Sequence, residues 1–105
     1  MIYSVVVEPS AKADIRSIVT YIRSEFGYEQ YAASLFEALY RAIASLKQNP
    51  RRYQKYEEGI YVKRDVHKMP VRKYNVYYTV DDTKKKNVTV LRVFYSGRNQ
   101  ELVND

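Results

Sequence analysis

The chain has 105 residues and a formal net charge of +6, and hydrophobic residues make up 46% of it. A chain of this length suits one domain with a small core, so we expect residues 1–105 to form a single domain. No apolar run approaches the roughly 20 residues of a membrane-spanning helix, the N-terminus does not resemble a signal peptide, and cysteine is absent. These features exclude disulfides and thiolate metal sites and favour a cytoplasmic protein without membrane contact.

The positive charge is concentrated in the second half of the chain. Residues 1–50 hold five Lys/Arg and five Asp/Glu, whereas residues 51–105 hold thirteen Lys/Arg and seven Asp/Glu and carry the whole net charge. This asymmetry favours a polyanionic or acidic partner, although a solvated basic surface gives the same pattern. The 12 tyrosines suit cores, protein interfaces and base stacking alike.

A strand and a helix are predicted first in the chain. Ile2 to Val7 is a short β-rich run that Glu8-Pro9 ends. Ser10 is expected to be the N-cap of a helix over residues 10–26, because apolar residues follow it with gaps of three and four. Gly27 is expected to end this helix.

A second helix is predicted over residues 28–48. Its apolar stripe repeats with the same gaps, and Asn49-Pro50 ends it because the residue before proline leaves helical geometry. Two amphipathic helices joined by almost no loop make an antiparallel hairpin, and their apolar stripes must cover a shared surface.

That surface is expected to be a β-sheet built from the second half of the chain. Residues 51–59 are predicted to be a loop, and strands are expected near 60–64, 66–71, 74–81 and 87–95. Pro70 cannot donate a ladder hydrogen bond, so its strand should lie at an edge or be bulged. The predicted fold class is α+β: an N-terminal strand, and an antiparallel helical hairpin packed on one face of a three- or four-stranded antiparallel C-terminal sheet.

Four short segments have a familiar order and spacing across almost the whole chain. They are residues 9–15 (PSAKADI), 42–50 (AIASLKQNP), 71–78 (VRKYNVYY) and 90–98 (VLRVFYSGR). Together they resemble the RelE/ParE toxin superfamily of type II toxin–antitoxin systems. The resemblance implies a toxin that a cognate antitoxin neutralises, with a helix laid against the helical hairpin and a strand added to the sheet. It also implies one of two targets, DNA gyrase for ParE-like members or messenger RNA in the ribosome for RelE-like members.

The strongest chemical signal in the sequence is basic. One histidine excludes a multi-histidine metal site, and there is no Gly-rich phosphate loop, so we expect no metal and no cofactor. A metal-free ribonuclease would need cations to stabilise the phosphate and a proton-transfer group. The candidate catalytic residues, if the chain is a nuclease, are Arg98, Tyr95, Arg72 and His67. The candidate target or nucleic-acid contacts are Lys63, Arg64, Lys68, Arg72, Lys73, Arg92 and Arg98.

Each candidate also has a plainer interpretation. Arg98 matches a functional arginine of the family, but it could be a solvated charge at a strand end. Tyr95 could stack on a base or transfer a proton, or be a half-buried sheet residue. His67 could act as an acid or base, although a lone histidine in a basic strand is more often a surface residue. The run 84–86 (KKK) is expected at a hairpin tip, as a solubilising turn or a nucleic-acid contact.

Asn75 departs from the RelE-like pattern. RelE-like nucleases carry a catalytic arginine at the matching place, and asparagine has no charge. Side chains alternate between the two faces of a strand, so of Arg72 and Lys73 only Lys73 is expected on the same face as Asn75. A tight turn would move even Lys73 away from that face. This departure favours a ParE-like gyrase poison over the alternative, a ribosome-dependent messenger-RNA endonuclease.

Tyrosines on the rims of the two helices are candidates for antitoxin binding. Tyr21 and Tyr28 lie near the turn between the helices, and Tyr40 lies further along the second one; simple packing is the alternative for all three. A plain nucleic-acid-binding module, which would need no antitoxin, is a third hypothesis for the whole chain.

Overall fold

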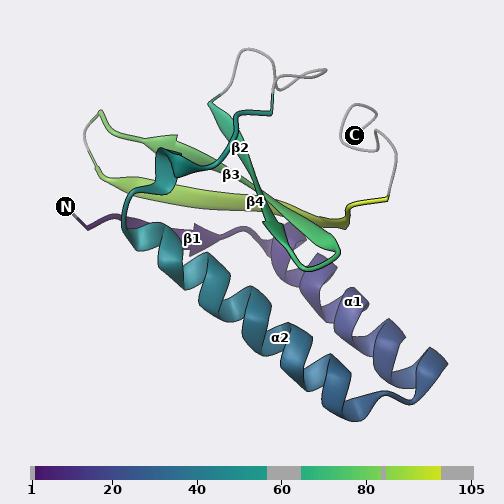
Figure 1. The fold of residues 1–105 in the computed structure, drawn as a ribbon. Helices are drawn as coiled ribbons and strands as arrows, with labels where there is room; N and C mark the ends of the chain where they lie inside the picture. The colour runs from purple at the N-terminus through teal and green to yellow at the C-terminus, as the bar shows by residue number, and fades with distance from the viewer. Residues whose placement is uncertain (1, 57–64, 84, 98–105) are drawn as a thin grey trace.

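The computed structural model describes residues 2–56, 65–83 and 85–97 (Figure 1). Its elements are the strand β1 (Ser4–Val7), the helices α1 (Pro9–Phe26) and α2 (Glu29–Ala44), the short 3-10 helices η1 (Ser45–Lys47) and η2 (Pro50–Arg52), and the strands β2 (Val66–Val71), β3 (Tyr74–Asp81) and β4 (Asn87–Tyr95). The α+β prediction is confirmed, with both long helices side by side on one face of the sheet (Figure 1). Within the described ranges, neither helix is long and apolar enough to cross a membrane.

The sheet has the strand order β1-β4-β3-β2 and is mixed. The strands β2, β3 and β4 pair antiparallel, as predicted. The strand β1 lies parallel to β4, with Ser4 opposite Asn87 and Val7 opposite Val90. Parallel neighbours need a long crossover connection, and the chain from α1 to β3 supplies it here. The strand expected over residues 60–64 lies outside the described residues.

The ends of the helices differ in part from the sequence prediction. The N-cap prediction for Ser10 is wrong: α1 begins at Pro9, with Glu8 in the N-cap position. Proline suits the first helical turn because its fixed φ is already helical and its missing N–H is not needed there. Gly27 ends α1 as predicted, with a left-handed φ of 66° and its N–H donating to the carbonyl of Arg23 at 3.0 Å. The second helix ends at Ala44, because the chain then tightens into η1.

The core lies between the helical hairpin and the sheet. The helices contribute Ala11, Val19, Ile22, Ala32, Leu35, Leu39 and Ile43, and the strands contribute Met69, Val71, Val76, Tyr78, Val80, Val88, Val90 and Val93. A smaller cluster of Val66, Tyr77 and Phe94 covers the opposite face of the sheet. Each fully buried aliphatic side chain contributes about 1.5–3 kcal/mol, so the hairpin and the sheet stabilise each other.

The edge of β4 changes its partner along its length. The strand β1 pairs with it only as far as Val90, whose carbonyl accepts from the N–H of Glu8 at 2.9 Å. Beyond Val90, residues of α1 bond to the edge of β4 instead, and the Ser10 hydroxyl donates to the carbonyl of Leu91 at 3.1 Å. The carboxylate of Asp14 then accepts from the N–H of Val93 at 2.9 Å. The first turns of α1 therefore satisfy the backbone groups that β1 leaves open.

Asp14 also binds the side chain of Arg92. The two carboxylate oxygens accept from Nε at 2.9 Å and from Nη2 at 3.1 Å. The ladder between β3 and β4 shifts register here, since Tyr77 faces Arg92 while Tyr78 faces Val90. A bulge of this kind bends a strand and redirects a side chain, and this one brings the guanidinium to α1.

We predict that Asp14→Asn destabilises the protein by about 2 kcal/mol, because an amide cannot replace a bidentate, largely buried carboxylate. Urea denaturation measures the change. The matched control is Glu37→Gln, which breaks the exposed ion pair between Glu37 and Arg41 and should cost less than about 0.5 kcal/mol. Equal losses in the two variants would contradict the anchoring role of Asp14.

Candidate functional site

An apolar groove of about 1160 Å³ lies where the turn between the helices meets the end of the sheet. Its lining comes from the end of α1, the start of α2, the start of β3 and the end of β4. The lining residues are Ser17, Ile18, Tyr21, Ile22, Phe26, Tyr28, Tyr31, Lys73, Tyr74 and Tyr95. We call this feature the aromatic groove, because six of these residues are tyrosine or phenylalanine.

The aromatic rings of the groove contact one another, and all but Tyr74 are exposed to solvent. Phe26 meets Tyr21 edge to face, with ring centroids 5.6 Å apart, and stacks on Tyr28 at 5.8 Å. Tyr74 and Tyr95, which face each other across the β3–β4 ladder, pack at 5.8 Å. Tyr21 and Tyr28 are 58% and 60% exposed. A contiguous exposed apolar patch on a small domain is typical of a protein-binding surface.

Local geometry explains why these rings meet. The left-handed turn at Gly27 reverses the chain between the helices, so that the last turn of α1 lies beside the first turn of α2. The sheet end closes the groove from the other side, where burial, followed by the neighbouring hydroxyls of Tyr31 and Tyr95, raises the pKa of Tyr74.

Sequence reasoning found only part of this groove. Tyr21, Tyr28 and Tyr95 were among the predicted site residues, whereas Phe26 and Tyr31 were not, and neither was Tyr74. The aromatic residues that cluster on both sides of Gly27 in the sequence could have indicated that Phe26 and Tyr31 belong to the same surface.

The turn between β2 and β3 places two of the candidate cations beside this groove. Arg72 has a φ of 54°, a left-handed value of the kind that tight hairpin turns require. Its guanidinium donates to the Ser34 hydroxyl at 2.7 Å and lies 5.6 Å from the ring centre of Tyr31. Lys73 is exposed and lines the groove. The turn thus fastens β2 and β3 to α2.

The remaining candidates lie elsewhere. Lys68 faces Tyr77 across the sheet, and cross-strand partners share a face, so it belongs to the side away from the helices. Arg92 binds Asp14. Lys63, Arg64 and Arg98 lie outside the described residues, and so does part of the run 84–86. The structure therefore brings Tyr21, Tyr28, Tyr95 and Lys73 together and places Lys68 and Arg92 apart from them.

His67 is not the surface residue that a basic strand suggested. It is 3% exposed, and its ring stacks on that of Tyr78 with centroids 5.4 Å apart. Its Nδ1 lies 2.8 Å from the carbonyl oxygen of Tyr53, and its Nε2 lies 3.1 Å from a carboxylate oxygen of Asp65. The hydrogen bonds explain the burial, since a polar ring is tolerated inside when both of its nitrogens have partners.

Tyr40 belongs to a second, smaller depression of about 390 Å³ between β1 and the helices. It is 65% exposed and shares this surface with Val5, Phe36 and the side chains of Lys12 and Lys47. Tyr40 therefore does not join Tyr21 and Tyr28 in the aromatic groove.

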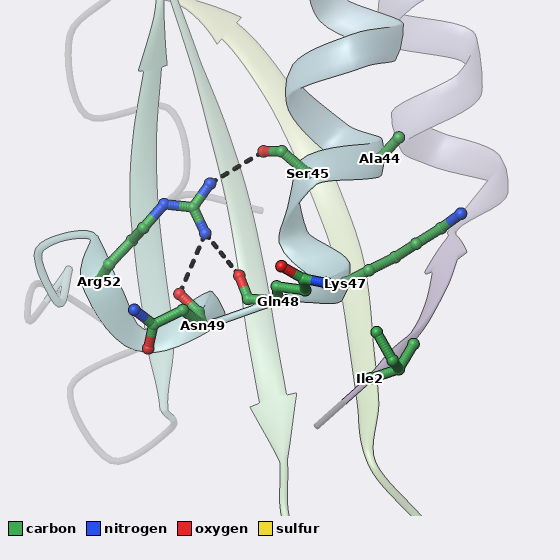
Figure 2. A pocket seen from close by; sticks show the side chains of 7 residues that line it. All are labelled: Ile2, Ala44, Ser45, Lys47, Gln48, Asn49 and Arg52. Carbon is green, nitrogen blue, oxygen red and sulfur yellow. Dashed lines mark hydrogen bonds between the residues drawn. The ribbon is translucent and has the colours of Figure 1, made fainter.

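A third hollow lies at the end of α2, and Arg52, one of the two cations that line it, is structural (Figure 2). The Arg52 guanidinium donates to the carbonyls of Gln48 at 2.7 Å and Asn49 at 3.0 Å, and to the Ser45 hydroxyl at 2.9 Å (Figure 2). Carbonyls at the end of a helix lack helical partners, and a cation there is favoured by the helix dipole. Arg52 therefore caps the end of the helical segment formed by α2 and η1.

A polar network ties the N-terminus to the hairpin between β3 and β4. Asp82 accepts from the Tyr3 hydroxyl at 2.5 Å and from Nε of Arg51 at 2.9 Å. Arg51 also pairs with Asp65. The hydrogen bond from Tyr3, and next the one from Arg51, lowers the pKa of Asp82 below its ordinary value.

A family model described as "ParE toxin of type II toxin-antitoxin system, parDE" matches residues 5–100. The fold is similar to that in the chromosomal ParDE toxin–antitoxin system from P. aeruginosa, with a TM-score of 0.71 and 14% identity over 90% of this chain and 96% of the other. It is also similar to the archaeal RelE–RelB complex from Pyrococcus horikoshii, with a TM-score of 0.64 and 17% identity over 93% and 99% of the two chains.

A mutant of the E. coli toxin RelE in the free state has the same fold, with a TM-score of 0.63 and 17% identity over 99% of this chain and 92% of the other. At these identities the likeness concerns the fold alone. No curated protein sequence matches the chain.

We predict that Asp82 makes the stability of the folded protein fall as the pH is lowered into the acid range. A carboxyl with a lowered pKa in the folded state stabilises the fold above its unfolded pKa, and this contribution is lost as pH falls through the folded value. Asp82→Asn should therefore lose less stability than the wild type between neutral pH and about pH 3. Urea midpoints across this range measure the effect.

Tyr3→Phe removes the largest cause of the lowered pKa but keeps the carboxyl, so it should give an intermediate acid profile. An Asp82→Asn variant with the acid profile of the wild type would overturn the prediction.

Proposed function

This chain belongs to the ParE toxin family of type II toxin–antitoxin systems, and we propose that it stops growth by poisoning DNA gyrase and that a cognate antitoxin neutralises it. The observation that carries the proposal is the family match over residues 5–100.

The surroundings of Asn75 support a protein-directed toxin rather than a ribonuclease. Asn75 faces Pro70 and Phe94 across the sheet, on the side away from the helices. Lys73, the one cation near it in the same strand that shares its parity, lines the aromatic groove instead, while Lys68 of β2 lies on the same face as Asn75. Arg92 is held by Asp14. A ribonuclease needs a cation aimed at the phosphate, and an asparagine at this place cannot supply one.

We further propose that the aromatic groove binds an amphipathic helix of the antitoxin. Exposed tyrosines in an apolar groove are typical anchors for such a helix. Lys73 at the groove and the net charge of +6 favour an acidic partner, because complementary charge speeds association. In this proposal Tyr21 and Tyr28 anchor the helix, and Tyr40 contacts another part of the same antitoxin in the depression beside β1.

The target is tested with the purified toxin. We expect it to stabilise gyrase-mediated DNA breaks and to leave ribosome-bound messenger RNA intact. Arg98→Ala should reduce the gyrase effect, because Arg98 matches the family's functional arginine. Arg41→Ala, which removes an exposed helix arginine paired with Glu37, is the matched control and should act like the wild type. Cleaved messenger RNA with unaffected gyrase would replace this proposal with the endonuclease alternative.

The antitoxin site is tested by calorimetry with the cognate antitoxin. Tyr21→Ala and Tyr28→Ala should each weaken binding by about 10- to 100-fold, which is typical for interface anchors. Gln30→Ala, at an exposed position of α2 outside both depressions, should change the affinity less than about twofold. Tyr40→Ala measures the contribution of the second depression. Unchanged affinity in both groove variants would rule out the aromatic groove as the docking site.

A further inference from the structure

Gly97 lies just beyond the end of β4, against the side chain of Tyr95. A Cβ atom at this position would lie 2.6 Å from Cε2 of the Tyr95 ring, 3.2 Å from Cδ2 and 3.4 Å from Cζ. Carbon atoms that are not bonded to each other prefer a separation of about 3.5–4.0 Å. A residue with a side chain therefore does not fit at position 97 while the Tyr95 ring keeps its place.

The backbone of Gly97 does not itself require glycine. Among the described residues, Gly27 is the glycine with a positive φ, at 66°. A side chain there would meet no atom within 4 Å, so glycine at position 27 serves the left-handed turn. Gly97 is the reverse case, because its φ lies outside the left-handed region and its missing side chain leaves space for a ring.

The backbone at the end of β4 is held by the sheet. The N–H of Ser96 donates to the carbonyl of Lys73 at 2.7 Å, and Tyr95 faces Tyr74 across the β3–β4 ladder. The Tyr95 side chain, in contrast, borders solvent, since the residue is 52% exposed. A clash at position 97 would therefore be relieved by rotation of the ring and not by movement of the backbone.

The position of the Tyr95 ring shapes the sheet end of the aromatic groove. The ring packs edge to face against Tyr74, with centroids 5.8 Å apart, and both residues line the groove. Rotation of the ring away from Gly97 would break this favourable geometry. It would alter the sheet end of the groove while Tyr21 and Phe26 at the helical end keep their places.

We propose that Gly97 is a positioning residue of the aromatic groove. Its lack of a side chain lets the Tyr95 ring fold back over the chain and against Tyr74. There the ring forms the wall that an apolar side chain of the antitoxin helix contacts. Gly97 acts on the partner only through Tyr95, and the inference rests on the proposed docking of an antitoxin helix in this groove.

NMR of the free toxin tests the position of the ring without any partner. In the wild type, NOE contacts should connect the Tyr95 ring with the Hα protons of Gly97 and with the Tyr74 ring. The contact between the two rings should weaken in Gly97→Ala and be lost in Gly97→Val, because the larger side chain displaces the ring further. Unchanged contacts between the rings in Gly97→Val would overturn the proposal.

The fold itself should tolerate the smaller change, since the displaced ring moves toward solvent. The thermal midpoint of Gly97→Ala should stay within about 4 °C of the wild type. A larger fall would show that the backbone had moved instead of the ring and would contradict the proposal. Ser96→Ala, at an exposed position outside the groove lining, is the matched control and should keep the ring contacts and the antitoxin affinity of the wild type.

Calorimetry with the cognate antitoxin measures the consequence for binding. Gly97→Ala should weaken binding by about three- to tenfold and Gly97→Val by about 10- to 100-fold, because a displaced anchor no longer fits its partner. In a Tyr95→Ala background there is no ring to displace, so Gly97→Ala should then change the affinity by less than about twofold. An equal loss in both backgrounds would show that Gly97 does not act through Tyr95.

The outcomes separate this inference from the proposed docking site. If Tyr21→Ala weakens binding and Gly97→Val does not, the groove stays the docking site and the role given to Gly97 is wrong. If neither variant changes the affinity, the groove is not the docking site and both proposals are overturned.

Discussion

The contact on which the rest of this structure depends is the one between Asp14 and β4. One carboxylate on α1 accepts from the side chain of Arg92 and from the backbone N–H of Val93. It does so where β1 has ended and the edge of β4 would otherwise be open. This contact fixes α1, and through the short turn at Gly27 it also fixes where α2 begins. The ends of the helices then meet the end of the sheet, and the aromatic groove lies at that junction.

The arginines that the structure describes in the basic second half serve the fold. Arg51 binds Asp65 and Asp82, Arg52 binds the carbonyls that follow α2, and Arg92 binds Asp14. A guanidinium suits such positions because its planar set of donors can serve several acceptors at once. Within the described part of the chain, the groove at the turn between the helices exposes an aromatic surface instead. This arrangement suits a protein that recognises other proteins, in keeping with its membership of the ParE toxin family.

The outer edge of β2 and the end of the β3–β4 ladder differ in how much of them is covered. The outer edge of β2 is covered by Pro70 and by backbone hydrogen bonds from Lys68 to Gln54 and from Tyr56 to Val66, whereas the end of β3 and β4 at Tyr74 and Tyr95 opens into the aromatic groove. The protein thus limits uncontrolled strand pairing while presenting an apolar surface of defined shape.

Local patterns in the sequence determined the α+β class, the two helices, the stop at Gly27 and the strands over 66–71, 74–81 and 87–95, because hydrophobic period and turn residues act over a few neighbouring positions. Only the tertiary structure decided the parallel pairing of β1 with β4, the contact between Asp14 and Arg92, the burial of His67 and the placing of Lys73 in the groove. These depend on contacts between residues far apart in the chain, such as Asp14 and Arg92, or on one tight turn that reverses a side chain. The sequence pattern alone does not indicate which distant residue will pair with a given charged side chain. The roles of Arg98, Lys63 and Arg64 stay predictions of the sequence.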